Sequence, residues 1–142
     1  MSGKGDMMTT PRRNTGLLLS GDLAVFVMFA LVGRETHASA GRDPNLVVNA
    51  LPTLMPFALI WLLAAVPMGV YRPTVYRLTP LTIIRTLAAW LVTAPIALYA
   101  RALLLARTAI PAPFIIVTLG LNGALLIAWH VFFAWWLKRA GR

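Results

Sequence analysis

The sequence contains no cysteine among its 142 residues, which excludes disulfides, thiolate metal sites and cysteine nucleophiles. Charged residues are also scarce, at 12% of the chain against about 25% in a typical soluble domain. Hydrophobic residues, in contrast, make up 59% of the chain. The surface of a water-soluble fold of this size needs more polar side chains than this sequence contains. We therefore expect lipid to surround most of the protein.

Sequence motifs of enzymes are missing as well. There is no nucleophile elbow, phosphate-binding loop, helical pair of histidines or dinucleotide fingerprint. Serine occurs only at Ser2, Ser20 and Ser39, and Ser20 would not share a helix face with Asp22. We therefore expect no enzymatic activity and no cofactor. A lipid-modifying enzyme stays the weakest of the functional alternatives.

Long apolar runs are what the sequence contains instead. In a hydrocarbon core each backbone amide must be bonded internally, which favours a helix. Crossing a core of about 30 Å then needs about 20 apolar residues, since a helix rises about 1.5 Å per residue. Four segments meet this requirement: 15–33, 46–70, 81–105 and 114–137. The second contains Pro52, Pro56 and Pro67 and is expected to bend. The predicted fold is an all-α integral membrane four-helix bundle.

The domain organisation follows from these runs. Residues 1–14 form a basic head that we expect to be disordered, 15–137 form a single membrane domain, and 138–142 form a tail. The pair Arg12-Arg13 with a later Ala38-Ser39-Ala40 also resembles a secretory signal and its cleavage site. Asp22 interrupts that apolar run, which is long enough to span, so we expect the first span to be retained.

Basic residues predict the orientation, because Lys and Arg are retained on the cytoplasmic side of a membrane. Of 13 basic residues, nine lie near one side and four near the other, which predicts cytoplasmic termini. The same distribution explains the net charge of +9, because basic residues that flank the spans act as anchors and attract membrane lipids. We therefore expect no nucleic-acid binding. The larger group is Lys4, Arg12, Arg13, Arg72, Arg77, Arg85, Lys138, Arg139 and Arg142; the smaller is Arg34, Arg42, Arg101 and Arg107.

Asp22 is the residue in the spans that most needs an explanation. A carboxyl group in hydrocarbon costs about 2.5–3.5 kcal/mol and tends to face the bundle interior. By residue count, Arg85 and His130 lie at a similar depth, and the three together form a predicted inner polar site. One interpretation is structural: Asp22 pairs with Arg85, or Arg85 extends to the interface while Asp22 is neutral. The other is a cavity that admits protons, an ion or an anionic head group.

Two helix faces carry predicted packing residues. On the first span Asp22, Phe26, Phe29 and Gly33 form one stripe that should face other helices. On the fourth span three small residues recur every four positions and allow close approach of another backbone, within the chain or between chains. They are Gly120, Ala124 and Ala128, and Asn122 lies beside them, where we expect it to bond across helices.

A second polar group is predicted at the other membrane face. Its members end the first span, begin the second or end the third: Arg34, Glu35, His37, Asp43, Asn45, Asn49 and Arg101. His37 with Glu35 and Asp43 lacks a recurring metal-ligand spacing, so we predict no metal site. His37 is instead a candidate for a pH-sensitive or proton-relaying group, and Arg101 for an interfacial anchor.

Several of these residues carry a family resemblance. Gly21-Asp22, Phe26, Phe29 and the run from Gly33 to His37 resemble the opening of domain of unknown function family 3054, small prokaryotic membrane proteins. Over residues 17–137 the further matches are Pro56-Phe57, Trp61, Arg101, Phe114-Ile115-Ile116-Val117 and Trp129, while His130 stands where the family pattern suggests Arg. The resemblance implies four spans in a prokaryotic inner membrane and supplies no activity.

Two functional hypotheses follow. In the first, the protein is a small transport or permeation protein, with Asp22, Arg85 and His130 as its inner site and His37 and Arg101 as its outer site. In the second, it is a membrane scaffold or accessory subunit that binds a partner protein through its helices, and the buried charges only fix helix register. Because four helices enclose little interior, a homo-oligomer is compatible with both hypotheses.

Overall fold

The computed structural model describes residues 6–35 and 45–141, with side chains described for 12–33 and 45–141. Every element in this part of the chain is helical, which confirms the all-α prediction. The elements are α1 (Asp6–Glu35), α2 (Leu46–Ala65), α3 (Pro73–Tyr76), α4 (Thr79–Leu104), α5 (Ala112–Val117), the π-helical η1 (Thr118–Asn122) and α6 (Gly123–Arg139).

Four helices are long and apolar enough to cross a membrane, as the sequence predicted. They are Arg12–Gly33 within α1, Leu46–Ala65, Thr79–Leu104, and Ala112–Arg139, which joins α5, η1 and α6. Their outer surfaces are strongly apolar: Leu63 of α2 is 75% exposed and Ile116 of α5 is 70% exposed. Burying such surfaces in hydrocarbon is favourable, which fits a multi-pass membrane protein.

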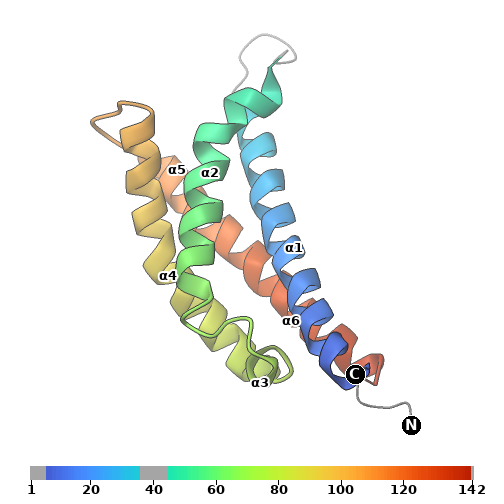
Figure 1. The fold of residues 1–142 in the computed structure, drawn as a ribbon. Helices are drawn as coiled ribbons and strands as arrows, with labels where there is room; N and C mark the ends of the chain where they lie inside the picture. Colours follow the sequence, from blue (N-terminus) through green and yellow to red (C-terminus); the bar gives the residue numbers. More distant parts are fainter. Residues whose placement is uncertain (1–5, 36–44, 142) are drawn as a thin grey trace.

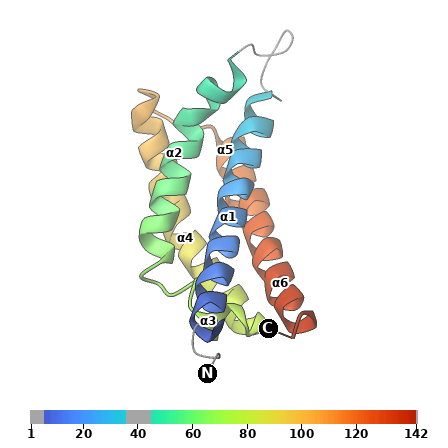
Figure 2. The same cartoon turned by 45° about the vertical axis from the view of Figure 1, so that its right-hand side comes forward.

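The helices form an antiparallel bundle in which α2 packs against both α1 and α4, and α6 packs against both α4 and α1. Figures 1 and 2 show that α1 begins, and α6 ends, at the same end of the bundle. The short α3 also lies there, whereas the connection between α4 and α5 lies at the opposite end. We call these the termini end and the far end.

Prolines and one glycine shape the second span. Pro52 and Pro56 lie inside α2, and its N-terminal part bends away from the rest of the helix (Figures 1 and 2), as expected where helical hydrogen bonds are lost. The helix ends at Ala65, earlier than the predicted residue 70. Beyond it the chain turns, because Gly69 has φ +75°, a conformation that a side chain disfavours.

The core at mid-height consists mainly of large aromatic rings. Phe26 of α1 lies 6.1 Å, centroid to centroid, from both Trp61 of α2 and Trp90 of α4. Phe57 joins them at 6.5 Å from Phe26 and 6.1 Å from Trp90. These four residues, each at most 1% exposed, are called the aromatic layer below. Edge-to-face and tilted contacts of this kind stabilise the bundle beyond the contribution of the buried apolar area alone.

Two tryptophans lie across glycines of a neighbouring helix. A methyl group added at Gly21 would meet the indole of Trp129, which donates to the carbonyl of Leu18 at 3.0 Å. At Gly123 it would meet Trp90, which donates to the carbonyl of Leu119 at 3.1 Å. In both places the glycine has no side chain, so the indole can approach closely. It reaches the carbonyl of a residue about one helical turn before the glycine. These contacts hold α1 to α6 and α6 to α4.

Candidate functional site

The Asp22 carboxylate is fully buried and has hydrogen-bond partners on three other parts of the chain. Its Oδ2 accepts from Trp61 Nε1 at 2.9 Å and from the Tyr71 hydroxyl at 2.6 Å. Its Oδ1 lies 2.9 Å from His130 Nε2. These four residues are called the Asp22 cluster below. It joins α1, α2, the connection from α2 to α3, and α6.

Helical spacing aims each side chain at the same point. On α1 Asn14, Leu18, Asp22 and Phe26 recur every four residues and are all buried, so Asp22 faces the bundle interior. On α6 His130 continues the same kind of buried face. Tyr71 comes instead from the turn after α2, where the Thr15 hydroxyl donates to its carbonyl at 3.4 Å. The turn thus brings the phenol back toward α1.

Among the residues whose side chains are described, no lysine or arginine contacts the Asp22 carboxyl group. Asp22 lies about 15 Å along α1 from Arg12, near the middle of a hydrocarbon core of about 30 Å. Trp61, Tyr71 and His130 supply the hydrogen bonds that water would otherwise give, and bonds to an ionised acceptor are stronger than neutral ones.

Tyr71 remains a donor because its phenol is hard to ionise. Burial raises the pKa of Tyr71 above its ordinary value, and the negative charge of Asp22 raises it further. Its oxygen also accepts from Trp61 Nε1 at 2.9 Å, so the indole hydrogen is shared between the phenol and the carboxylate. The proton of the phenol therefore points to Asp22 Oδ2.

His130 is fixed by one ring nitrogen only. Its Nε2 faces Asp22, whereas its Nδ1 is buried and has no hydrogen-bond partner among the described residues. A neutral imidazole that donates from Nε2 carries a free lone pair on Nδ1, which can accept a proton or a water hydrogen. Histidine is the side chain best suited to exchange a proton near neutral pH.

Further buried polar atoms lack partners in the described part of the chain. Toward the termini end they are the amide of Asn14, the Tyr76 hydroxyl and the Thr86 hydroxyl. Toward the far end they are the Thr118 hydroxyl and the amide of Asn122. Buried polar groups are nearly always paired, so these positions suit water molecules in the bundle interior.

The predicted partner Arg85 does not reach Asp22, so the predicted ion pair is wrong. Arg85 is exposed, and its guanidinium donates only to the Met68 carbonyl, at 3.4 Å. The inward positions of α4 here are Thr82, Thr86 and Ala89, and a residue next to Thr86 is turned by about 100° from that face. Arg85 instead extends outward, the alternative that the sequence left open, while His130 contacts the carboxylate.

The predicted packing residues divide into two groups. Phe26 and Phe29 are buried, and Phe29 meets Phe57 at 6.2 Å, whereas Gly33 is only partly buried. The small residues Gly120, Ala124 and Ala128 are exposed, and nothing lies within 4 Å of a methyl group added at Gly120. The described residues therefore leave this face uncovered. Asn122, expected to bond across helices, is buried without a partner among the described residues.

The predicted outer rim is described only in part. Arg101 is half-buried at the far end, where its Nε donates to the Thr53 hydroxyl at 2.8 Å and its guanidinium lies 4.1 Å from the Phe114 ring centroid. Asn45 and Asn49 are exposed. His37 and Asp43 lie outside the described residues, as do the side chains of Arg34 and Glu35.

Sequence reasoning missed two members of the Asp22 cluster as site residues. Trp61 follows Phe57 by four residues, so the inward spacing on α2 was a usable signal. Tyr71 had no such signal, because its position depends on the turn after Ala65. Within the described residues no three His, Asp or Glu side chains group as metal ligands.

The chain has a match among known protein families. Residues 19–133 match the family model described as Protein of unknown function (DUF3054). The chain belongs to the DUF3054 family. No curated protein and no solved structure matches it. The whole Asp22 cluster lies inside the range matched by the family, whose description names no activity, so the function must be argued from the cluster itself.

Proposed function

We propose that this protein is a small membrane transport protein in which Asp22 and His130 form a proton-binding site. The observation that carries the proposal is the buried contact between Asp22 Oδ1 and His130 Nε2, within two candidate membrane spans, with His130 Nδ1 left free in the described structure. Ionisable residues inside a membrane are costly and commonly belong to ion or proton pathways.

The arrangement supports exchange of a proton between two acceptors. In the tautomer protonated at Nε2, His130 donates a hydrogen bond to Asp22, and its Nδ1 lone pair accepts an incoming proton, which produces an imidazolium beside a carboxylate. Transfer of the Nε2 proton to Oδ1 then leaves a neutral imidazole protonated at Nδ1 and a neutral carboxyl group. Because Asp22 links α1 to α2 and α6, a change in its charge alters the contacts among these helices.

The two sides of the cluster differ. Toward the termini end the unpartnered side chains of Asn14, Tyr76 and Thr86 offer polar positions for water. Toward the far end the aromatic layer follows directly, since Phe26 is one helical turn beyond Asp22. We infer that protons reach the cluster from the termini end and that the aromatic layer blocks free leakage. We further propose that the termini end faces the cytoplasm of a prokaryotic inner membrane, as the basic residues predict.

The experiment is proton flux into vesicles containing purified protein and an internal pH-sensitive dye, under an imposed proton gradient and membrane potential. The native protein should acidify the vesicles faster than protein-free vesicles, alone or when a panel of ions and metabolites is added outside. Asp22→Asn and His130→Gln should each abolish the difference, because each removes one proton acceptor.

Ser20→Ala provides the matched control, since Ser20 lies on the exposed face of the same helix and bonds only to the Gly16 carbonyl. Its flux should equal that of the native protein. Native protein that moves no proton under any of these conditions, or Asp22→Asn with unchanged flux, contradicts the proposal.

A second candidate function is that of a membrane scaffold or accessory subunit that binds a partner protein through its helices. It is favoured by the uncovered face of Gly120, Ala124 and Ala128, which suits close packing of another membrane helix. In this interpretation the Asp22 cluster fixes the register of the helices and moves no proton. Co-purification of one stoichiometric partner that persists in Asp22→Asn, with no proton flux, would support it.

A further inference from the structure

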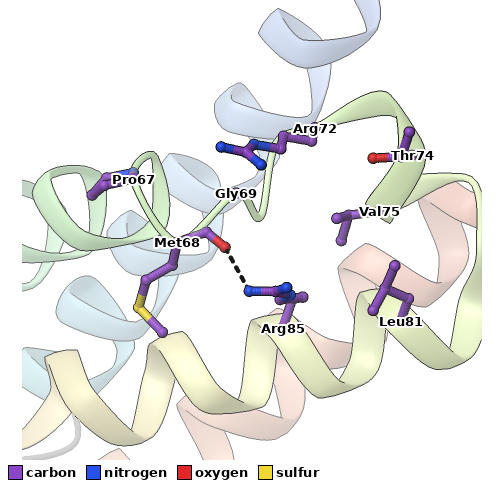
Figure 3. A pocket seen from close by; sticks show the side chains of 8 residues that line it. All are labelled: Pro67, Met68, Gly69, Arg72, Thr74, Val75, Leu81 and Arg85. Carbon is purple, nitrogen blue, oxygen red and sulfur yellow. Dashed lines mark hydrogen bonds between the residues drawn. The ribbon is translucent and has the colours of Figure 1, made fainter.

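A second polar site lies outside the Asp22 cluster, at the termini end. A cavity of about 180 Å³ separates the turn after α2 from the first turns of α4. Figure 3 shows the side chains around it, with Arg72 on one side of the turn and Arg85 on the other. The remaining lining residues are Pro67, Met68, Gly69, Thr74, Val75 and Leu81.

The Arg72 side chain lies against the backbone of the turn at this cavity. Its Cδ and Nε would lie 3.1 Å from a methyl group added at Gly69, so the side chain lies over the glycine. The guanidinium is exposed and makes no hydrogen bond with the described residues. The lack of a side chain at Gly69 thus allows the positive φ of the turn. It also leaves room for the Arg72 side chain to lie over the glycine.

Arg85 approaches the same cavity from α4. Its only hydrogen bond with the described residues goes to the Met68 carbonyl, at the long distance of 3.4 Å (Figure 3). Most of its five N–H donors therefore stay available. The Thr74 hydroxyl adds a further donor from α3, and in Figure 3 it points toward the space between the two arginines.

No acidic side chain balances these two charges in the described part of the chain. The sequence has four acidic residues, and Asp22 is the one whose side chain is described; it is engaged by Trp61, Tyr71 and His130. We propose that the cavity binds a phosphate group, with Arg72 and Arg85 as the charged ligands and Thr74 as a neutral donor.

The chemistry of the lining favours phosphate over other anions. Guanidinium groups match the oxygens of a phosphate in pairs and tolerate partial burial better than an ammonium group. The cavity is large enough, since an engineered cavity of about 150 Å³ accommodates benzene. Phosphate reaches such an interfacial position either as the head group of an anionic lipid or as a soluble phosphate ester.

The experiment measures binding to the full-length protein in a mild detergent. One arm adds phosphatidylglycerol or phosphatidylcholine and follows bound lipid by native mass spectrometry. The other arm adds inorganic phosphate or a soluble glycerol phosphate and follows binding by calorimetry. Preference for phosphatidylglycerol over phosphatidylcholine identifies the lipid as source, whereas saturable binding of the soluble phosphates identifies the soluble ester.

Variants separate this cavity from general surface charge. Arg72→Gln with Arg85→Gln should weaken binding by about tenfold or more, because both charged ligands are lost. Arg72→Lys with Arg85→Lys keeps the charge and should still weaken binding, because the forked donors are lost. The matched control is Arg12→Gln with Arg77→Gln, which removes two exposed charges from the same end but none from the cavity.

Each outcome is decisive once the melting temperature shows that the variants are folded. Selective loss in the Arg72 and Arg85 variants supports the site. Equal loss in the control pair overturns it, because binding would then depend on net charge alone. Absence of binding in both arms overturns it as well. Phosphate binding and proton flux are separate measurements, so failure of one proposal is distinguishable from failure of the other.

Discussion

At the residue scale, a carboxyl group at the depth of Asp22 can be neutral or can be ionised and hydrogen-bonded. Trp61 and Tyr71 donate to Asp22 within 2.9 Å, and His130 Nε2 lies 2.9 Å from it. Such bonds are stronger to a charged acceptor than to a neutral one. The same bonds leave the group sensitive, since removing one donor leaves an oxygen lone pair unsatisfied away from water.

Loss of one hydrogen-bond donor to Asp22 should lower the stability of the folded protein. Tyr71→Phe is expected to lower the free energy of unfolding by about 1.5–3 kcal/mol, the range for a bond to a charged group. Unfolding in mixed detergent micelles, followed by tryptophan fluorescence, measures it. Tyr99→Phe, on a ring that is 64% exposed on α4, is the control and should change little. Equal effects of the two substitutions would show that the Tyr71 hydroxyl contributes nothing specific.

The raised pKa of Tyr71 also predicts a dependence on pH. The folded state holds the phenolic proton more strongly than the unfolded state, so this contribution is complete below the ordinary tyrosine pKa of about 10. It decreases as the pH rises above that value. The melting temperature of the native protein should therefore fall more steeply in alkaline solution than that of Tyr71→Phe. Parallel curves would contradict this.

At the element scale, the helices themselves follow from apolar length, but their contacts depend on individual small residues. The fourth span shows this most clearly. Its residues 118–122 form a π-helical turn, and the Leu119 carbonyl within it accepts the indole of Trp90. Nothing in the apolar pattern of the span indicated this.

Gly21 tests the contact between α1 and α6. Gly21→Ala places a methyl group against the Trp129 indole and should cost about 1–3 kcal/mol of stability by overpacking. Gly16→Ala on the same helix has open space around it and should be neutral or slightly stabilising. Thermal unfolding of the two variants in detergent gives the comparison. A stable Gly21→Ala protein would show that the indole can move away without loss.

The element boundaries show how far sequence reasoning reaches. The predicted third span, 81–105, agrees with α4 to within two residues at each end, because apolar length defines it. The second was predicted to continue to residue 70 but its helix ends at Ala65. The apolar composition of 66–70 hid a turn whose positive φ at Gly69 depends on local backbone geometry.

At the scale of the whole molecule, the arrangement α1, α2, α4, α6 around the bundle leaves the small-residue face of the fourth span outside. Within the described residues, no helix covers the face formed by Gly120, Ala124 and Ala128, which we call the small-residue seam. Another helix is the natural occupant of such a face in a membrane, and a second copy of this chain supplies one without further assumption.

The absence of cysteine provides a clean background for testing this assembly. Ala124→Cys should form a disulfide-linked dimer when reconstituted protein is oxidised, because matching seams would bring the two sulfur atoms together. Leu63→Cys serves as the control and should stay monomeric. Leu63 is 75% exposed, but it lies on α2 and not on the helix that carries Ala124. A monomeric Ala124→Cys protein would argue against a homo-oligomer built on this face.

The sequence alone determined the environment, the four spans and the inward face of Asp22, because apolar length and helical periodicity are local properties of a chain. Tertiary structure alone decided that His130, not Arg85, meets the carboxylate, and that Trp61 and Tyr71 complete its hydrogen bonds. Depth along each helix is readable from residue counts, whereas rotation and the course of a turn depend on contacts between distant residues. The composition of the cluster therefore became visible only when the helices were packed.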